Sequence, residues 1–203
     1  MIDWTTLSIN KFNQIKELVL DPEYTEEDRL LYEIQILFDV DPFKLSMSQL
    51  NYFTKQMVFL SKPIPKMKVK EKYKLGYNTY TLDKRLSAFS VAQWIDWRHL
   101  INDGGTDTEN YANLLSVFII PEGKSEYNEG YDIEEVKKDI GNYMSIADAM
   151  AISAFFLNYQ KALLIRSLLY SRRMTLRTKL PREQRKKVRK EYRRALIAVI
   201  TGR

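Results

Sequence analysis

Helix-start signals recur along this chain, and they constrain its fold more than any other feature of the sequence. Each signal is a Ser, Thr or Asp whose side-chain oxygen can accept a backbone N–H from the first helical turn. Apolar residues spaced three or four apart follow each one, as in a helix with one buried face. The residues that give these signals are Ser8, Thr25, Ser46, Ser90, Thr106, Asp132 and Ser145. Together they predict a mainly α fold with a compact helical domain.

Residues 66–82 depart from this helical period. Lys occupies every second position from 66 to 74, and mostly apolar residues lie between the lysines. A period of two is typical of a β-strand with one exposed and one buried face. Gly76-Tyr77-Asn78 suits a turn into a second strand at 79–82, so we predict one β-hairpin at about residues 66–82. Its lysine row either blocks unwanted strand pairing, which we favour, or binds phosphate.

Charge divides the chain into two parts. Residues 172–194 contain 12 Lys or Arg and two Glu, a net charge of +10. The whole chain carries +6 and Arg203 adds one positive charge, so residues 1–171 carry −5. We therefore predict a helical body with the hairpin, residues 1–171, and a protruding basic C-terminal helical appendage, residues 172–203. Pro181 suits the first turn of its last helix.

The composition excludes several kinds of site. The chain has no Cys and a single His, His99, so it cannot build a zinc site from nitrogen and sulfur ligands. It has no glycine-rich phosphate-binding loop and no Gly-x-Ser-x-Gly sequence to present a catalytic serine. Its first residues show neither the basic start nor the apolar run of a signal peptide, and it contains no uncharged apolar stretch of about 18 to 20 residues. We expect an intracellular protein that uses no cofactor and does not contact a membrane.

One enzymatic alternative is a metal-dependent nuclease, which needs carboxylates for Mg²⁺ and a lysine near the attacking water. Residues 117–120 could form a strand that leads into Glu122 and Lys124, with Asp103 or Asp107 as a second ligand. However, the cap at Thr106 favours a helix over residues 108–120, which would leave Glu122 and Lys124 on a loop. We therefore expect no catalytic residue and no metal site.

The basic appendage combines an apolar stripe with a charged face. We expect the stripe to be an assembly interface that docks in a groove of a neighbouring subunit, formed by Val188, Tyr192, Leu196 and Val199. The charged face would contact phosphate or an acidic protein surface through Arg172, Arg173, Arg177, Arg182, Arg185, Lys186, Lys187, Arg189 and Lys190. Two alternatives are an arm that binds nucleic acid and a helix on an acidic membrane, although the appendage lacks the Trp or Phe usual at membranes.

The order of segments over roughly residues 5–160 is similar to that of a known group of proteins. These segments are an amphipathic helix at 7–20, Val58-Phe59-Leu60, Pro63 and Pro65, a basic hairpin around Gly76-Tyr77, Ala92-Gln93-Trp94-Ile95-Asp96, Pro121-Glu122-Gly123, Gly130-Tyr131-Asp132 and a helix at 145–157. In this order the chain resembles small helical assembly proteins of tailed bacteriophages, notably crAss-like phages, of the tail-assembly-chaperone or neck-and-tail structural kind. The resemblance implies a structural role for residues 121–132, against the nuclease. The basic helix falls outside it and favours a protein that stays in the virion.

We therefore expect a non-enzymatic structural protein of a tailed bacteriophage, a subunit of a multimeric neck or tail assembly such as a ring. The resemblance implies copies of itself and other phage neck or tail proteins as partners. The charge of the basic appendage, which lies outside the resemblance, adds DNA as a further contact. It also implies synthesis in the cytoplasm of the bacterial host and a place in the virion. The alternatives are a nucleic-acid-binding accessory protein that uses the same helix and, below it, the Mg²⁺-dependent nuclease.

Overall fold

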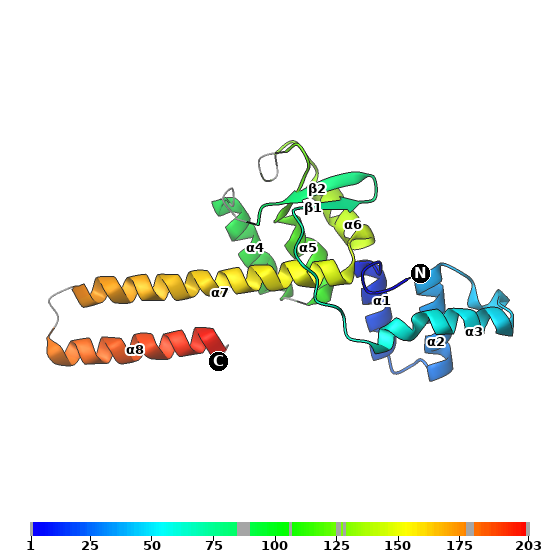
Figure 1. The fold of residues 1–203 in the computed structure, drawn as a ribbon, viewed down its shortest axis with the longest axis horizontal. Coiled ribbons are helices and arrows are strands. Elements are labelled where there is room, and N and C mark those ends of the chain that lie inside the picture. Colours follow the sequence, from blue (N-terminus) through cyan, green and yellow to red (C-terminus); the bar gives the residue numbers. More distant parts are fainter. Residues whose placement is uncertain are drawn as a thin grey trace. The chain divides into compact units, whose positions relative to one another are not determined.

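A computed structural model describes residues 2–84, 90–105, 107–124, 127, 129–177 and 181–201, and of some residues within these helices only the backbone. Tertiary contacts divide the chain into a first unit, Met1–Ser153, and a second unit, Ala154–Arg203. Eight α-helices and one small antiparallel sheet make up the described part (Figure 1), which confirms a mainly α fold. The helices are α1 (Ile9–Leu20), α2 (Glu26–Phe38), α3 (Met47–Gln56), α4 (Val91–Gly104), α5 (Tyr111–Ser116), α6 (Ile133–Tyr143), α7 (Ile146–Arg177) and α8 (Arg182–Thr201).

The predicted caps begin most of these helices. The Ser8 hydroxyl accepts the Lys11 N–H at the start of α1, and Asp132 caps α6 in the same way. Complete capping boxes, in which the third helical residue also accepts the N–H of the cap, start α2 at Thr25, α3 at Ser46 and α4 at Ser90. Ser145 accepts the Asp148 N–H at the start of α7. The predicted cap at Thr106 lies outside the described residues.

The predicted hairpin is present but shorter than expected. It consists of β1 (Lys72–Leu75) and β2 (Asn78–Leu82), and Tyr73 lies opposite Tyr80. The Leu82 N–H donates to the Glu71 carbonyl, so residues 66–70 lie beyond the end of β2 and are not a strand. Even so, all five lysines of the row are exposed, whereas Tyr73 and Leu75 are buried. The two-residue period therefore predicted correctly which side chains are exposed, but it predicted a strand that is longer than β1.

The sheet contains a third strand where we expected a helix. The helix predicted at 108–120 is a 3-10 turn (Thr108–Asn110) and α5, which ends at Ser116, and β3 (Ile119–Pro121) follows and pairs antiparallel with β2. Val117 and Ile119 are fully buried, and both are β-branched, which favours extended backbone on a half-buried sheet. The free edge of β2 thus provides hydrogen-bond partners that a longer α5 would not use.

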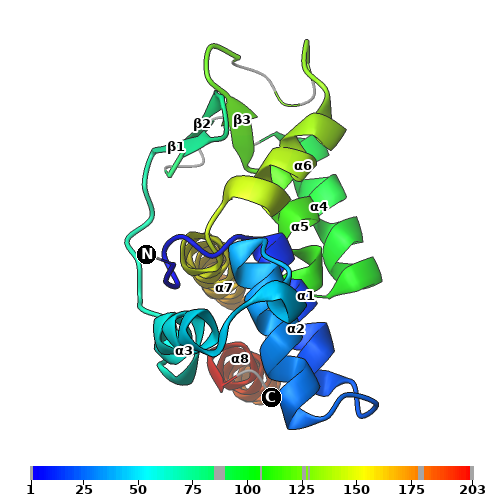
Figure 2. The same cartoon turned by 90° about the vertical axis from the view of Figure 1, so that its right-hand side faces the viewer.

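The core of the first unit lies between the sheet, α1, α5, α6 and the start of α7. Both α5 and α6 pack against the sheet (Figure 2). Two backbone hydrogen bonds tie the starts of α1 and α7 together, from the Ile9 N–H to the Met144 carbonyl at 3.1 Å and from the Ile146 N–H to the Leu7 carbonyl at 2.8 Å. The largest fully buried side chains are those of Leu7, Ile9, Ile34, Leu37, Tyr80, Leu115, Val117, Ile119, Ile140, Met144, Ile146 and Ile152.

The boundary between the two units lies inside α7, after Ser153, whereas the charge pattern suggested a boundary after residue 171. The described buried residues of α7 end at Phe156, and beyond it no described residue of α7 is buried. The helix therefore leaves the core well before the basic residues begin. Charge locates the basic segment, but burial decides where a compact unit ends.

Candidate assembly surface

The second unit is a pair of antiparallel helices, the continuation of α7 beyond Ser153 and the whole of α8 (Figure 1). In its described part, no residue after Phe156 is buried. Two helices can shield only one stripe of each other, and a unit this small rarely supplies a core of its own. Much of its apolar surface therefore faces solvent.

An apolar groove of about 340 Å³ lies between the two helices of this unit. It is lined by Leu168 and Leu169 of α7 and by Arg189, Tyr192, Arg193 and Leu196 of α8. Two members of the predicted stripe, Tyr192 and Leu196, thus face the chain's own α7, and all four members are half-buried rather than bare. Part of the stripe therefore packs within the helix pair, because an amphipathic helix covers its apolar face with the nearest apolar partner.

The larger exposed apolar surface comes mostly from α7, which our sequence analysis did not single out as an interface. Tyr170 is 65% exposed, Met174 is 45% exposed, and one helical turn separates them. The other large apolar side chains exposed in this unit are Leu157, Leu164, Leu169 and Ile197. The signal in the sequence was an apolar run from 155 to 170 with too few polar residues for a helix that is open to solvent on most sides.

Positive charge lies along the α8 wall of the groove, and further basic residues are exposed elsewhere on the helix pair. Among the residues predicted to contact phosphate or an acidic surface, Arg173, Lys186, Lys187, Arg189 and Lys190 are exposed. The backbones of Arg172, Arg177, Arg182 and Arg185 belong to α7 and α8, but their side chains lie outside what the structure describes. Arg189 and Arg193 are one turn apart on α8, and both line the groove. The surface can therefore bind an apolar segment that carries carboxylates beside it.

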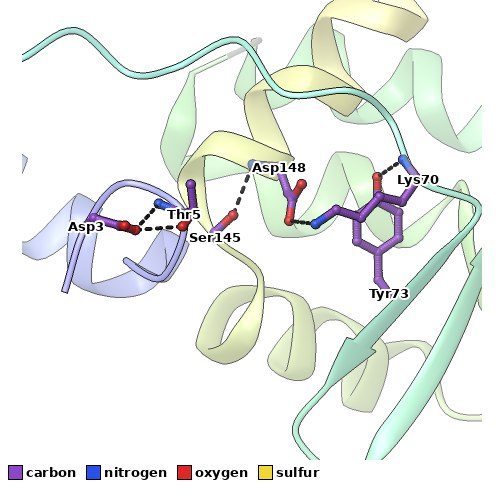
Figure 3. Close-up of polar contacts among 6 residues, drawn as sticks. All are labelled: Asp3, Thr5, Lys70, Tyr73, Ser145 and Asp148. Carbon is purple, nitrogen blue, oxygen red and sulfur yellow. Dashed lines mark hydrogen bonds and ion pairs between the residues drawn. The ribbon is translucent and has the colours of Figure 1, made fainter. Parts of the chain in front are cut away.

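Two lysines of the hairpin row form ion pairs with acidic residues elsewhere in the first unit. Lys70 Nζ lies 2.8 Å from Asp148 Oδ2, and the Lys70 backbone N–H donates to the Tyr73 hydroxyl at 2.9 Å (Figure 3). Asp148 is only 8% exposed, and its other carboxylate oxygen has no hydrogen-bond partner. Burial raises the pKa of Tyr73 to about 12, so this hydroxyl stays protonated at neutral pH. Lys72 pairs with Glu122. These contacts favour a structural role for part of the row over phosphate binding.

The residues of the nuclease alternative do not form a metal site with one another. Glu122 is paired with Lys72, and Asp103 and Asp107 are exposed on α4 and just before the 3-10 turn. No group of three or more His, Asp or Glu side chains that could hold a metal ion occurs in the part of the chain that the structure describes. His99 is exposed on α4.

A second concave surface lies at the tip of the hairpin and was not predicted. It has a volume of about 400 Å³ and is lined by Tyr77, Asn78, Thr79, Tyr80, Pro121, Glu122, Tyr131, Asp132, Glu135 and Val136. Beside it, Asp139 accepts hydrogen bonds from the Tyr80 hydroxyl at 2.6 Å and from the Asn78 amide at 2.9 Å. Burial and the Asp139 carboxylate both raise the pKa of Tyr80. These contacts fix the hairpin on α6.

Comparisons of the chain with family models, with curated proteins and with solved structures found no match. Among the described helices, none has the length and apolar character needed to cross a bilayer. The surface with the most distinctive chemistry is therefore the helix pair of the second unit, which combines exposed apolar side chains with a positively charged rim.

Proposed function

We propose that this chain is a non-enzymatic structural or assembly protein, a subunit of a multimeric complex that binds other proteins through its second unit. The observation that carries the proposal is the helix pair, which has no buried described residue after Phe156 and six large exposed apolar side chains. Of these side chains, Tyr170 and Met174 lie one helical turn apart on α7, and exposed apolar patches on soluble proteins often mark a contact with a partner. Burying one such side chain contributes roughly 1.5 to 3 kcal/mol, so a few of them can offset the entropy lost on association.

The resemblance to tailed-phage assembly proteins supports a more specific form of this proposal. In that form the complex is the neck or tail of a tailed bacteriophage, the protein is a component of the virion, and its partners are copies of itself and neighbouring neck or tail proteins. The helix pair suits such a role because its exposed apolar side chains can contact a neighbouring subunit. Catalysis has no place in this proposal.

The second candidate function is nucleic-acid binding, and the exposed Lys186, Lys187 and Lys190 favour it. A phosphate-binding helix depends on charge, and its affinity falls steeply as salt rises. An assembly helix depends on buried apolar area, and its charges mainly steer and orient the partner. Nucleic-acid binding therefore predicts that the lysines matter more than the apolar side chains, and assembly predicts the reverse.

The test compares two variants with the unchanged protein. Tyr170→Asp/Met174→Asp removes exposed apolar surface, and Lys186→Gln/Lys187→Gln/Lys190→Gln removes charge. Assembly into oligomers and affinity for DNA are measured across salt concentrations, with Tyr77→Asp as a control because Tyr77 is fully exposed in the first unit. We expect the apolar pair to abolish assembly while the lysine triple changes it little. Normal assembly of the apolar pair, with loss of DNA binding in the triple, would replace this proposal with the nucleic-acid one.

A further inference from the structure

The groove of the second unit sets two requirements on whatever fills it. Leu169 in its wall is 46% exposed, so the occupant must offer apolar side chains. Arg189 and Arg193, one turn apart on the α8 wall, are exposed and carry positive charge, so the occupant must place carboxylates beside those apolar side chains. An acidic peptide without apolar side chains meets only the charge requirement, and an apolar helix without carboxylates meets only the apolar one.

The end of α1 and the start of α2 meet both requirements. Residues 17–41 contain nine Asp or Glu and a single Arg, a net charge of −8 within a chain whose total is +6. At the end of α1, Leu20 is 70% exposed and Val19 is 46% exposed. Glu17, one turn before Leu20, and Glu23 beyond the helix are also exposed, and neither takes part in an ion pair with a described residue.

The structural role of the acidic residues explains only part of this pattern. Glu26 and Glu27 lie in the first turn of α2, where negative charge is stabilised by the helix dipole. Glu17 lies in the last turn of α1, where the dipole disfavours a carboxylate. Neither fact accounts for a leucine that is 70% exposed beside that carboxylate. A partner that supplies an apolar surface with positive charge at its edge accounts for both the Glu17 carboxylate and the exposed Leu20.

We propose that the occupant of the groove is the α1–α2 end of a second copy of this chain. Leu20 and Val19 of that copy would lie against Leu168, Leu169 and Leu196, and its Glu17 and Glu23 would face Arg189 and Arg193. The two surfaces differ, so the contact is head-to-tail and each copy keeps one free surface of each kind. Such contacts close into a ring or continue as a filament. This inference rests on the proposed assembly function and specifies its partner.

Charge reversal tests the pairing of the two surfaces. Glu17→Lys/Glu23→Lys makes the α1–α2 end positive, and Arg189→Glu/Arg193→Glu makes the edge of the groove negative. Each variant alone should self-associate at least about tenfold more weakly than the unchanged protein, because like charges then meet at the contact. An equal mixture of the two should recover association, since every contact in the mixture can again join opposite charges. Circular dichroism confirms that each variant is folded.

The outcomes separate this inference from the function it rests on. If the groove variant loses association but the α1–α2 variant does not, the second unit is an assembly surface, and another part of a second copy occupies the groove. If the mixture fails to recover association, the two surfaces do not pair and the inference is overturned. If neither variant changes association and Tyr170→Asp/Met174→Asp also has no effect, the proposed function fails as well.

A final variant checks the apolar half of the contact. Leu20→Asp should weaken self-association at least as much as the charge reversals do. Val91→Asp is the matched control, because Val91 is 75% exposed at the start of α4 and lies outside the proposed contact. Equal effects of the two substitutions would show that Leu20 has no special part in association and would overturn the inference.

Discussion

At the scale of single residues, the ion pair between Lys70 and Asp148 joins the segment before the hairpin to the first turn of α7. The Asp148 carboxylate is almost fully buried, whereas half of the Lys70 side chain is exposed. Removing the lysine would therefore leave a buried carboxylate without its charged partner. The sequence alone gave no reason to distinguish Lys70 from the other lysines of the row, because its partner lies 78 positions away.

We predict that Lys70→Gln lowers the free energy of unfolding by about 1 to 2 kcal/mol, because a buried acceptor loses its strongest donor. The control is Lys68→Gln, because Lys68 is exposed and lies two residues away in the same lysine row. This substitution should change the free energy of unfolding by about 0.5 kcal/mol or less. Urea titration of both variants measures the difference. Equal effects would show that the pair with Asp148 does not stabilise the fold.

At the scale of elements, the helices were predictable because their start signals are local. Thr25, Ser46 and Ser90 each form a reciprocal box with the residue three positions on, so a short sequence window contains the whole interaction. A strand at 117–120 was considered only with the nuclease alternative, and the local signals favoured a helix over the strand β3 that the structure has. β3 is extended because it pairs with the free edge of β2, some 40 residues earlier in the chain. A short sequence window around β3 does not include that partner strand.

The turn of the hairpin gives a test at this scale. Gly76 has a φ of +59°, and a Cβ at this position would lie 2.9 Å from a ring carbon of Tyr143. A left-handed backbone costs about 1 to 2 kcal/mol for a residue with a Cβ, so Gly76→Ala should destabilise the protein by at least that much. In a Tyr143→Ala background the cost should fall, because only the backbone term remains. An unchanged cost in that background would show that the ring contact is unimportant.

At the scale of the whole molecule, the charge pattern predicted a distinct basic segment and the structure located the compact unit that contains it. The sequence predicted that Tyr192 and Leu196 dock on a neighbouring subunit, and in the structure both line a groove beside the chain's own α7. The sequence analysis did not single out Leu168 and Leu169, because it assigned residues up to 171 to the helical body. Only the structure shows that described residues of α7 beyond Phe156 have no core around them.

Self-association is the property on which the proposed function depends most. The mass of the purified protein in solution, measured by light scattering over a range of concentrations and at low and high salt, tests it directly. We predict masses that rise with concentration above the 24.0 kDa of one chain. The increase should persist at high salt, because apolar burial drives the contact and charge only orients it. A mass of 24.0 kDa at every concentration, in low salt and in high salt, would contradict the proposal.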